Sequence, residues 1–336
     1  MKAAVVTRYG SPDVVAIAEM PKPTPAAGEL LIRVHTASVN RTDCGELRAH
    51  PFFMRLFTGL RRPRRSILGL DFAGEIEAVG AATTDTSFRP GDRVFGMCPS
   101  RSNGAQAEYV CVPERVVAAM PAGLRFDEAV VCEGAFYANG VLVKIGLRAG
   151  QGILIYGASG AIGTALVQLA KSLGAVVTAV AATPHLELVR SLSADRVIDY
   201  TAEDFTRIAE RFDLVVDAVG KTSFFRCRKL LNAKGIFAAT DLGAWGQNVA
   251  LALWSSITRS DRVIIATPTR IGGFVGFLGA RIEAGQFRAV VDRKYPLEKI
   301  ADAYRYVETG RKVGIVVIDV APAAAQQEAM TGSTRG

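Results

Sequence analysis

The sequence predicts an α/β protein in which a doubly wound parallel sheet follows a β-rich first third. Three observations support this fold class. Short apolar strands separated by turn residues run to about residue 126, as in a small barrel or sandwich. From about residue 127, helices alternate with buried strands, which is typical of parallel sheets. A glycine-rich turn joins the first of these strands to its helix.

Residues 152–199 form one predicted strand–helix–strand unit. The apolar run 153–156 ends in the glycine-rich turn, and an amphipathic helix follows that stops at Gly174 before a second strand at 176–180. In such a unit, backbone N–H groups at the helix N-terminus can bind a dinucleotide pyrophosphate. The alternative is a purely structural turn. We predict cofactor contacts from Gly157, Ala158, Ser159, Gly160, Ala161, Ile162 and Gly163.

The remaining elements follow from local patterns in chain order. In the β-rich part we expect a basic loop or short helix at 49–65, and strands at 3–6, 14–19, 30–39, 68–80, 88–96 and 105–113. In the second part, strands are expected at 176–180, 196–199, 214–219, 236–240 and 263–266. Helices near 274–283 and 297–308 and a closing strand at 314–319 complete the pattern. Residues 321–336 are small and polar and predict a disordered tail.

The charge of the chain does not favour a nucleic-acid partner. The net charge is +8, and five arginines lie in one acid-free stretch at 55–65. That stretch is a solvated basic loop, a phosphate-binding loop or a subunit contact. Aromatic residues are not interleaved with the basic ones as a base-stacking platform requires. We therefore expect no nucleic-acid partner.

The sequence favours a cytoplasmic protein without a membrane partner. No apolar run is long enough to span a bilayer, and residues 1–13 lack the layout of a signal peptide. The five cysteines are scattered and form no C-x-x-C pair, so a disulfide framework is not expected.

Several ordered motifs resemble the medium-chain dehydrogenase/reductase superfamily, in its zinc-free quinone oxidoreductase (zeta-crystallin-like) branch. The resemblance covers nearly all of 1–319. Its motifs are the glycine turn, Ser38-Val39-Asn40-Arg41-Thr42-Asp43, Gly69-Leu70-Asp71-Phe72-Ala73-Gly74 with Val79-Gly80, Pro90-Gly91-Asp92-Arg93-Val94, Ala107-Glu108-Tyr109-Val110, Val197-Ile198-Asp199-Tyr200 and the strand 213–220.

The resemblance implies two domains. A GroES-like β-barrel catalytic domain comprises 1–126 and 267–320, and a dinucleotide-binding Rossmann domain comprises the inserted 127–266. The resemblance also implies a homodimer formed through an apolar edge strand at 262–266, which a mass measurement in solution tests.

The resemblance implies that no metal is bound. Zinc-containing relatives have Cys where Asn40 stands and His-Glu where Leu70-Asp71 stands, and neither Asn nor Leu is a zinc ligand at such sites. Cys132 lies near the region of a third ligand and is expected to be a buried core thiol. Without a metal to stabilise an alkoxide, quinones and α,β-unsaturated carbonyls are the easier hydride acceptors.

The residues after the second strand favour NADPH. NAD enzymes place an acid there to hold the ribose hydroxyls, whereas the sequence has no acid at 181–185. The resemblance places Ala182, Thr183, His185 and Tyr200 around the 2′-phosphate of NADPH. The alternative is structural, with Thr183 as the N-cap of a helix and Pro184 as its first residue.

Two residues are candidates for catalysis. Asn40 resembles the family asparagine near the nicotinamide, and its alternative is a turn residue that satisfies local backbone groups. Tyr137 stands where relatives have Thr followed by Ala, so its phenol donates a proton to the substrate or its ring packs in the pocket wall. Asp43 and Asp71 are expected to hold the fold. Ser193 replaces a glycine that is usual in the family.

We therefore predict an NADPH-dependent, zinc-independent oxidoreductase that reduces a quinone or an α,β-unsaturated carbonyl. One alternative is an NAD(P)-dependent alcohol or aldehyde dehydrogenase. The other is a dinucleotide-binding module that senses redox state without turnover.

Overall fold

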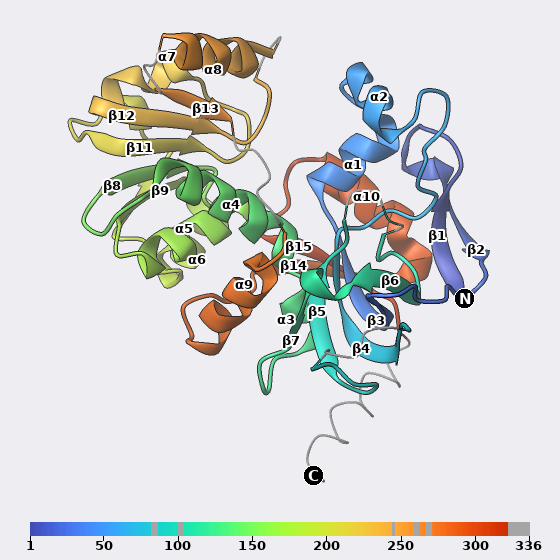
Figure 1. The fold of residues 1–336 in the computed structure, drawn as a ribbon. Coiled ribbons are helices and arrows are strands. Elements are labelled where there is room, and N and C mark those ends of the chain that lie inside the picture. Colours follow the sequence, from blue (N-terminus) through green and yellow to red (C-terminus); the bar gives the residue numbers. More distant parts are fainter. Residues whose placement is uncertain are drawn as a thin grey trace. The chain divides into compact units, whose positions relative to one another are not determined.

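The computed structural model describes residues 1–81, 87–99, 102, 104–243, 246–258, 262–265 and 271–321. The chain divides into two compact units (Figure 1). The first unit combines Met1–Glu133 with Arg270–Ala284 and Arg288–Gly336. The second consists of Gly134–Thr269 and Gly285–Phe287. The division therefore falls at residue 133/134, whereas the sequence pattern places the change at 126/127.

The second unit is built on a six-stranded parallel sheet with strand order β10-β9-β8-β11-β12-β13. Its strands are β8 (Gly152–Tyr156), β9 (Val176–Ala181), β10 (Arg196–Asp199), β11 (Phe212–Asp217), β12 (Leu231–Ala239) and β13 (Val263–Ile265). The first two strands of this unit, β8 and β9, pair side by side, and β11 then adds to the other side of β8. This reversal at β8 creates the crevice at the carboxyl ends of the strands where ligands bind in such sheets. The sheet confirms the predicted doubly wound fold.

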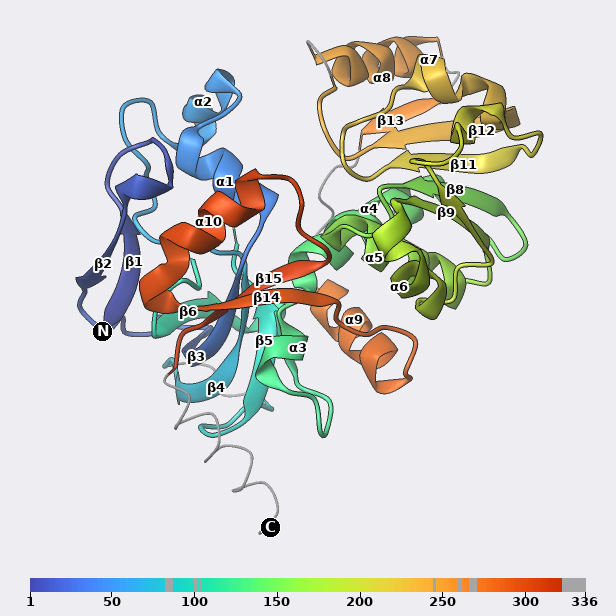
Figure 2. The ribbon, with the colours of Figure 1, turned by 180° about the vertical axis from the view of Figure 1, so that it is seen from behind.

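Helices cover both faces of this sheet, as Figures 1 and 2 show. On one face lie α4 (Cys132–Ile145), α5 (Ala161–Ser172) and α6 (Leu186–Ser191), and on the other lie α7 (Phe224–Cys227) and α8 (Gln247–Ile257). Shorter helices of this unit are η4 (Thr183–His185), η5 (Phe205–Arg207) and η6 (Arg228–Leu230). Leu166, Leu169 and Ala170 of α5 are buried, as the predicted apolar face requires.

The first unit is built on a mostly antiparallel sheet whose strand order is β14-β15-β3-β4-β5-β7, with β6 paired to β3. The strands are β3 (Glu29–Val39), β4 (Asp71–Val79), β5 (Arg93–Met97), β6 (Tyr109–Pro113), β7 (Val117–Ala119), β14 (Val291–Pro296) and β15 (Ile315–Asp319). A separate hairpin consists of β1 (Lys2–Val6) and β2 (Val15–Glu19). Because β15 pairs with β3, the last strand of the chain completes the sheet begun by the first third.

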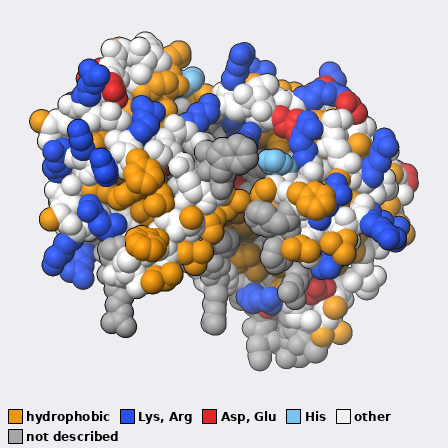
Figure 3. Space-filling view, turned by 90° about the horizontal axis from the view of Figure 1, so that it is seen from above, with side chains coloured by type: hydrophobic (Ala, Val, Ile, Leu, Met, Phe, Trp, Pro, Cys, Tyr) orange, Lys and Arg blue, Asp and Glu red, His pale blue; other side chains and the backbone are white. Residues whose placement is uncertain are grey.

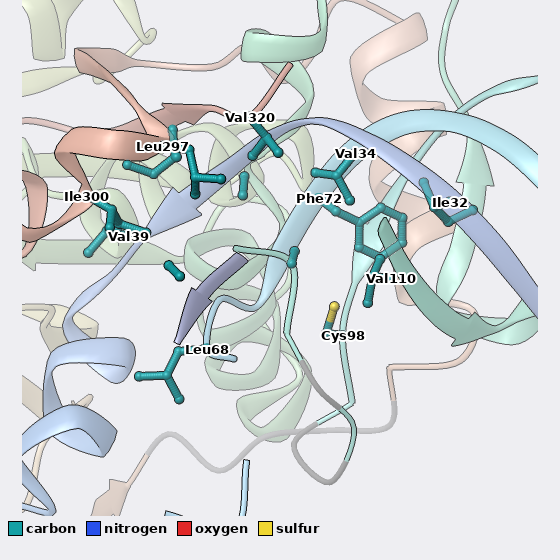
Figure 4. Packing of buried hydrophobic residues seen from close by; sticks show 14 of the residues in the cluster. Ile32, Val34, Val39, Leu68, Phe72, Cys98, Val110, Leu297, Ile300 and Val320 are labelled. Carbon is teal, nitrogen blue, oxygen red and sulfur yellow. The ribbon is translucent and has the colours of Figure 1, made fainter. Parts of the chain in front are cut away.

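The helices of the first unit are short apart from three. They are η1 (Pro12–Val14), α1 (Arg41–Arg48), η2 (Phe52–Met54), α2 (Arg55–Thr58), η3 (Glu114–Val116), α3 (Phe126–Ala129), α9 (Phe274–Glu283), η8 (Leu297–Lys299) and α10 (Ile300–Glu308). A core of buried side chains joins β3, β4 and β6 to α10. Figure 4 shows part of it, including Val34, Phe72, Val110 and Ile300.

Basic side chains are spread over the face shown in Figure 3, among groups of exposed hydrophobic ones. The exposed large hydrophobic side chains of the described residues include Leu253, Trp254 and Ile257 of α8 and Phe52 of η2. Among the described residues, no helix combines the length and apolar character that crossing a bilayer needs.

Three details differ from the sequence-based expectations. The strands β7 and β14 were not expected, because neither has an alternating apolar pattern. Thr183 is not an N-cap: Ala182 holds that position, and Thr183 begins η4. Ser193 has a φ of 70°, in the left-handed region that favours glycine, so replacing the usual glycine strains the end of α6. Of the predicted tail at 321–336, residues 322–336 lie outside the described residues.

Candidate functional site

The glycine turn between β8 and α5 needs the absence of side chains at two positions. Gly157 has a φ of 80°, and a Cβ there would lie 2.6 Å from Val219 Cγ1. A Cβ on Gly163 would lie 2.1 Å from the carbonyl oxygen of Gly157. Gly163 thus lets the first turn of α5 pack directly on the preceding loop. The first N–H groups of α5 have no partner within the helix, so they can bind an anion.

A buried carboxylate shapes the loop facing this turn. Asp217 ends β11 and accepts backbone N–H groups from Val219 (3.1 Å), Gly220 (2.9 Å) and Thr222 (2.8 Å). These bonds hold Val219 against Gly157. Burial raises the pKa of Asp217, although the N–H groups of Thr222 and Val219 oppose the shift. These hydrogen bonds therefore fix the loop after β11, which lies on one side of the glycine turn.

The other predicted cofactor residues lie at the ends of β9 and β10. Ala182, Thr183 and His185 follow β9, and Tyr200 follows β10, which pairs with β9 so that Asp199 lies opposite Ala181. Parallel strand ends meet at one edge, so the structure brings these residues together. A hollow of about 430 Å³ lies beside Tyr200, and its lining includes Tyr156, Phe205, Asp204 and Arg226.

A second group of polar side chains is buried in the first unit around Asn40. The Asn40 amide nitrogen donates to Ser38 Oγ (2.8 Å) and to Asp71 Oδ2 (3.3 Å), and the Ser38 hydroxyl donates to the same Asp71 oxygen (2.9 Å). The other oxygen of Asp71 accepts the backbone N–H of Glu133 (2.8 Å). Asn40 Oδ1 has no hydrogen-bond partner among the described residues, although Asn40 is only 1% exposed.

Asp43 holds the backbone beside this group. Its carboxylate accepts the N–H of Asn40 (2.8 Å) and the N–H of Gly69 (3.1 Å). Asn40 is the N-cap residue of α1, its side-chain nitrogen donates to Ser38 and Asp71, and Asp43 accepts its backbone N–H. Both Asp43 and Asp71 act as hydrogen-bond acceptors that hold segments together, as the sequence reasoning expected.

Burial makes these carboxyl groups weak acids. It raises the pKa of Asp71 to about 7, aided by the neighbouring Glu133 carboxyl and opposed by the bonds from Ser38, Glu133 and Asn40. It also raises the pKa of Asp43 well above its ordinary value and raises that of Glu133. Asp71 therefore exchanges a proton near neutral pH.

Sequence reasoning missed the part of this group formed by Glu133, Thr42 and Lys312. The Thr42 hydroxyl donates to Glu133 Oε1 (2.6 Å), and burial lowers the pKa of Lys312 while the Glu133 charge opposes that shift. A lone acid after the apolar run 129–132 was the available signal for Glu133. No local pattern pointed to Lys312, because its electrostatic effect on Glu133 depends on the position of the distant segment before β15.

The two candidate catalytic residues belong to different units. Asn40 lies in the first unit, and Tyr137 lies in the second, on α4, half-buried with its ring edge-on to Phe136 at 6.2 Å between centroids. Their roles beside a nicotinamide stay predictions.

The sequence matches two family models, described as alcohol dehydrogenase GroES-like domain over residues 26–122 and zinc-binding dehydrogenase over residues 192–318. It is 32% identical to 2-methylene-furan-3-one reductase of Solanum lycopersicum, a match that covers 96% of this chain and 80% of the relative. It is 31% identical to the chloroplastic NADPH-dependent alkenal/one oxidoreductase of Arabidopsis thaliana, over 95% and 79%. The chain belongs to the medium-chain dehydrogenase/reductase superfamily.

A solved structure supports the same assignment. The quinone oxidoreductase from Coxiella burnetii superposes with a TM-score of 0.83 and 25% identity, over 96% of this chain and 99% of that one. As a member of this superfamily, the protein is an oxidoreductase. Its relatives include quinone oxidoreductases and alkenal or enoyl reductases.

The residues of the second unit fit the nicotinamide cofactor of the superfamily. The glycine turn is closely packed, because a Cβ at Gly157 or Gly163 would clash with Val219 or with the Gly157 carbonyl, and it leads into the N-terminus of a helix of 12 residues. Ser159 and Gly160 of this turn are partly exposed, and Ala161 and Ile162 begin the helix, so their N–H groups can hold a pyrophosphate. Ala158 is buried and packs the turn onto the sheet.

The residues of the first unit do not fit the zinc that one family description names. Asn40 and Leu70 offer no metal ligand, and the Asn40 amide nitrogen already donates to Ser38 and Asp71. Burial raises the pKa of the Cys132 thiol well above its ordinary value, which disfavours the thiolate that zinc binds. The described parts of the chain contain no group of three or more His, Cys, Asp or Glu side chains that could hold a metal.

Gly163→Ala is expected to destabilise the protein and weaken dinucleotide binding. The new methyl group would press on the Gly157 carbonyl, and such overpacking costs about 1–3 kcal/mol. Urea unfolding and fluorescence titration with NADPH measure both effects. Gly276→Ala is the matched control, because it adds the same methyl group to exposed helix α9 with nothing within 4 Å. Equal stability of the two variants would contradict the close-packing argument.

Asp71→Asn is expected to flatten the pH dependence of stability. The folded pKa of about 7 exceeds the unfolded value of about 3.9, so the folded protein retains a proton that the unfolded chain releases. The contribution of Asp71 to the free energy of unfolding therefore falls as pH rises from about 4 to 7.

Urea unfolding at pH 5 and pH 8 measures the difference. Asp195→Asn serves as the control, because Lys171 and the Val177 N–H lower the pKa of Asp195 and its titration lies below this window. Identical losses of stability between pH 5 and 8 in the wild type and Asp71→Asn would show that Asp71 does not titrate there.

Proposed function

We propose that the protein is an NADPH-dependent, zinc-independent reductase of quinones or α,β-unsaturated carbonyls. The observation that carries the proposal is the donor set around Asn40 and Asp71, which suits hydrogen bonding and not metal binding. An oxidoreductase with this donor set has no Lewis acid to stabilise an alkoxide. It is therefore suited to substrates that spread the developing charge over a conjugated system.

The choice of NADPH is supported by the residues after β9. No acid lies in 181–185, where NAD enzymes place the carboxylate that holds the ribose. The hollow beside Tyr200 includes the guanidinium-bearing Arg226, which could attract a 2′-phosphate. One relative is named as NADPH-dependent and acting on alkenals or alkenones.

When bound, the nicotinamide supplies a hydride, and the chain supplies position and protons. The glycine turn and the N-terminus of α5 hold the pyrophosphate. The amide of Asn40, fixed by Ser38 and Asp71, presents its unpaired Oδ1 as an acceptor for an N–H group. The Tyr137 hydroxyl donates a proton to the substrate oxygen as it gains charge.

Steady-state oxidation of NADPH tests the proposal. The purified protein should oxidise NADPH with a panel of quinones and enones, and prolonged chelation should leave the rate unchanged. Elemental analysis should find no stoichiometric zinc. Oxidation of simple alcohols without quinone or enone reduction, or one zinc per chain, would reject this function. An absence of turnover alongside tight NADPH binding would indicate a redox-sensing module instead.

Tyr137→Phe is expected to lower turnover by roughly 10²- to 10⁴-fold, the scale of a positioned general acid. The change removes the hydroxyl and keeps the ring, so NADPH affinity should stay the same. Tyr306→Phe, which removes a hydroxyl bound to Asp292 in the first unit, is the control and should retain full activity. Unaltered turnover in Tyr137→Phe would assign the residue to packing, with water as the proton source.

A further inference from the structure

The loop after β9 is tied to a carboxylate from the neighbouring strand. The Thr183 hydroxyl donates to Asp199 Oδ2 at 2.6 Å, and the Thr201 hydroxyl donates to Asp199 Oδ1 at 2.6 Å. The backbone N–H of Thr201 also donates to Oδ1, at 2.9 Å. Asp199 is the last residue of β10 and lies opposite Ala181, the last residue of β9. An acid is thus present at this strand end, supplied by the adjacent strand.

The hydrogen bonds leave this cluster with acceptors only. Each threonine hydroxyl has a single hydrogen, and Asp199 accepts both. The two hydroxyl oxygens also lie 2.8 Å apart, a contact that would need one of the same two hydrogens. These hydrogen bonds lower the pKa of Asp199, with the bond from Thr183 the largest cause, so the group is an anion at neutral pH. A ligand that approaches Thr183 therefore meets lone pairs and a negative charge.

The two nicotinamide cofactors differ in what they can offer such a surface. The ribose 2′-hydroxyl of NADH can donate a hydrogen bond to it. The 2′-phosphate of NADPH carries about −1.5 to −2 charge near neutral pH and offers mostly acceptor oxygens. Like charges repel, and acceptors facing acceptors cannot bond.

We propose that Asp199 is a specificity-determining residue that restrains the preference for a 2′-phosphorylated cofactor. The inference rests on the proposed function, because it places the cofactor ribose beside Thr183. Asp199 does not reverse the preference for NADPH. Its negative charge opposes the attraction between Arg226 and the 2′-phosphate. NADH therefore still binds and serves as a second reductant.

Asp195 provides a matched comparison beside the same sheet. Its carboxylate accepts the Val177 N–H at 2.7 Å and the Lys171 ammonium group at 2.8 Å. Its pKa is also lowered, because these donors outweigh the effect of burial. Val177 lies near the beginning of β9, so Asp195 is at the opposite end of the strands from Thr183, and it is not among the residues that line the hollow with Arg226. The comparison separates Asp199 from the general loss of one surface charge.

The test is calorimetric titration of the whole protein with adenosine 2′,5′-bisphosphate and with 5′-AMP, which differ only in the 2′-phosphate. In Asp199→Asn, the ratio of the two affinities should shift toward the bisphosphate by at least tenfold, because a charge is removed and Thr183 regains its donor. NADPH and NADH should show the same shift. Asp195→Asn should leave the ratio at its wild-type value. Asp199→Ser should act like Asp199→Asn and covers the case in which the amide variant fails to fold.

The outcomes separate this inference from the proposed function. An unchanged ratio in both Asp199 variants, or an equal shift in Asp195→Asn, would overturn the role of Asp199 whatever the wild type prefers. A failure of both fragments to bind to every variant would also overturn it. A wild type that binds both fragments but does not oxidise NADPH with any quinone or enone would reject the proposed function and leave the ratio test intact.

Discussion

The hydrogen bonds of the Asp71 carboxyl group connect distant segments of the first unit. Asp71 begins β4, and it accepts hydrogen bonds from Ser38 at the end of β3, from Asn40 before α1 and from the Glu133 N–H in α4. A buried carboxyl is expensive to desolvate, so these donors must all be in place for the group to be tolerated. Three segments far apart in the chain are thereby set in one arrangement, and Asn40 is oriented as part of it.

Much of the fold could be predicted from local patterns. The alternation of buried strands and helices after residue 127 and the glycine turn identified the parallel sheet and α5, because periodicity and turn chemistry are local properties. The strand β14 could not be predicted in this way. Its exposed residues Arg293 and Lys294 interrupt the apolar pattern by which a strand is recognised. The strand forms because it pairs in parallel with the apolar β15.

The candidate site was only partly predictable. The glycine turn could be recognised from its composition. The position of Asp199 beside the loop after β9 could not, because it depends on which strand pairs with β9. Sequence spacing put the nearest acid after β9 at Glu187, yet Asp199 reaches Thr183 through strand pairing. Glu133 and Lys312 are a similar case, since their interaction joins residues from opposite ends of the first unit. Contacts between distant segments carry no local signature.

The pairing of β15 with β3 has a consequence for the order in which the chain folds during synthesis. The central strand β3 is synthesised early, whereas β15, in which Val316 pairs with Val39, is synthesised near the end. The sheet therefore stays incomplete on that side of β3 until then. The second unit, from Gly134 to Thr269 apart from three residues, emerges whole before that. Because domains generally fold as units as they leave the ribosome, the inserted unit can fold first. The incomplete sheet meanwhile exposes an unpaired strand edge, the kind of surface that attracts chaperones and aggregation.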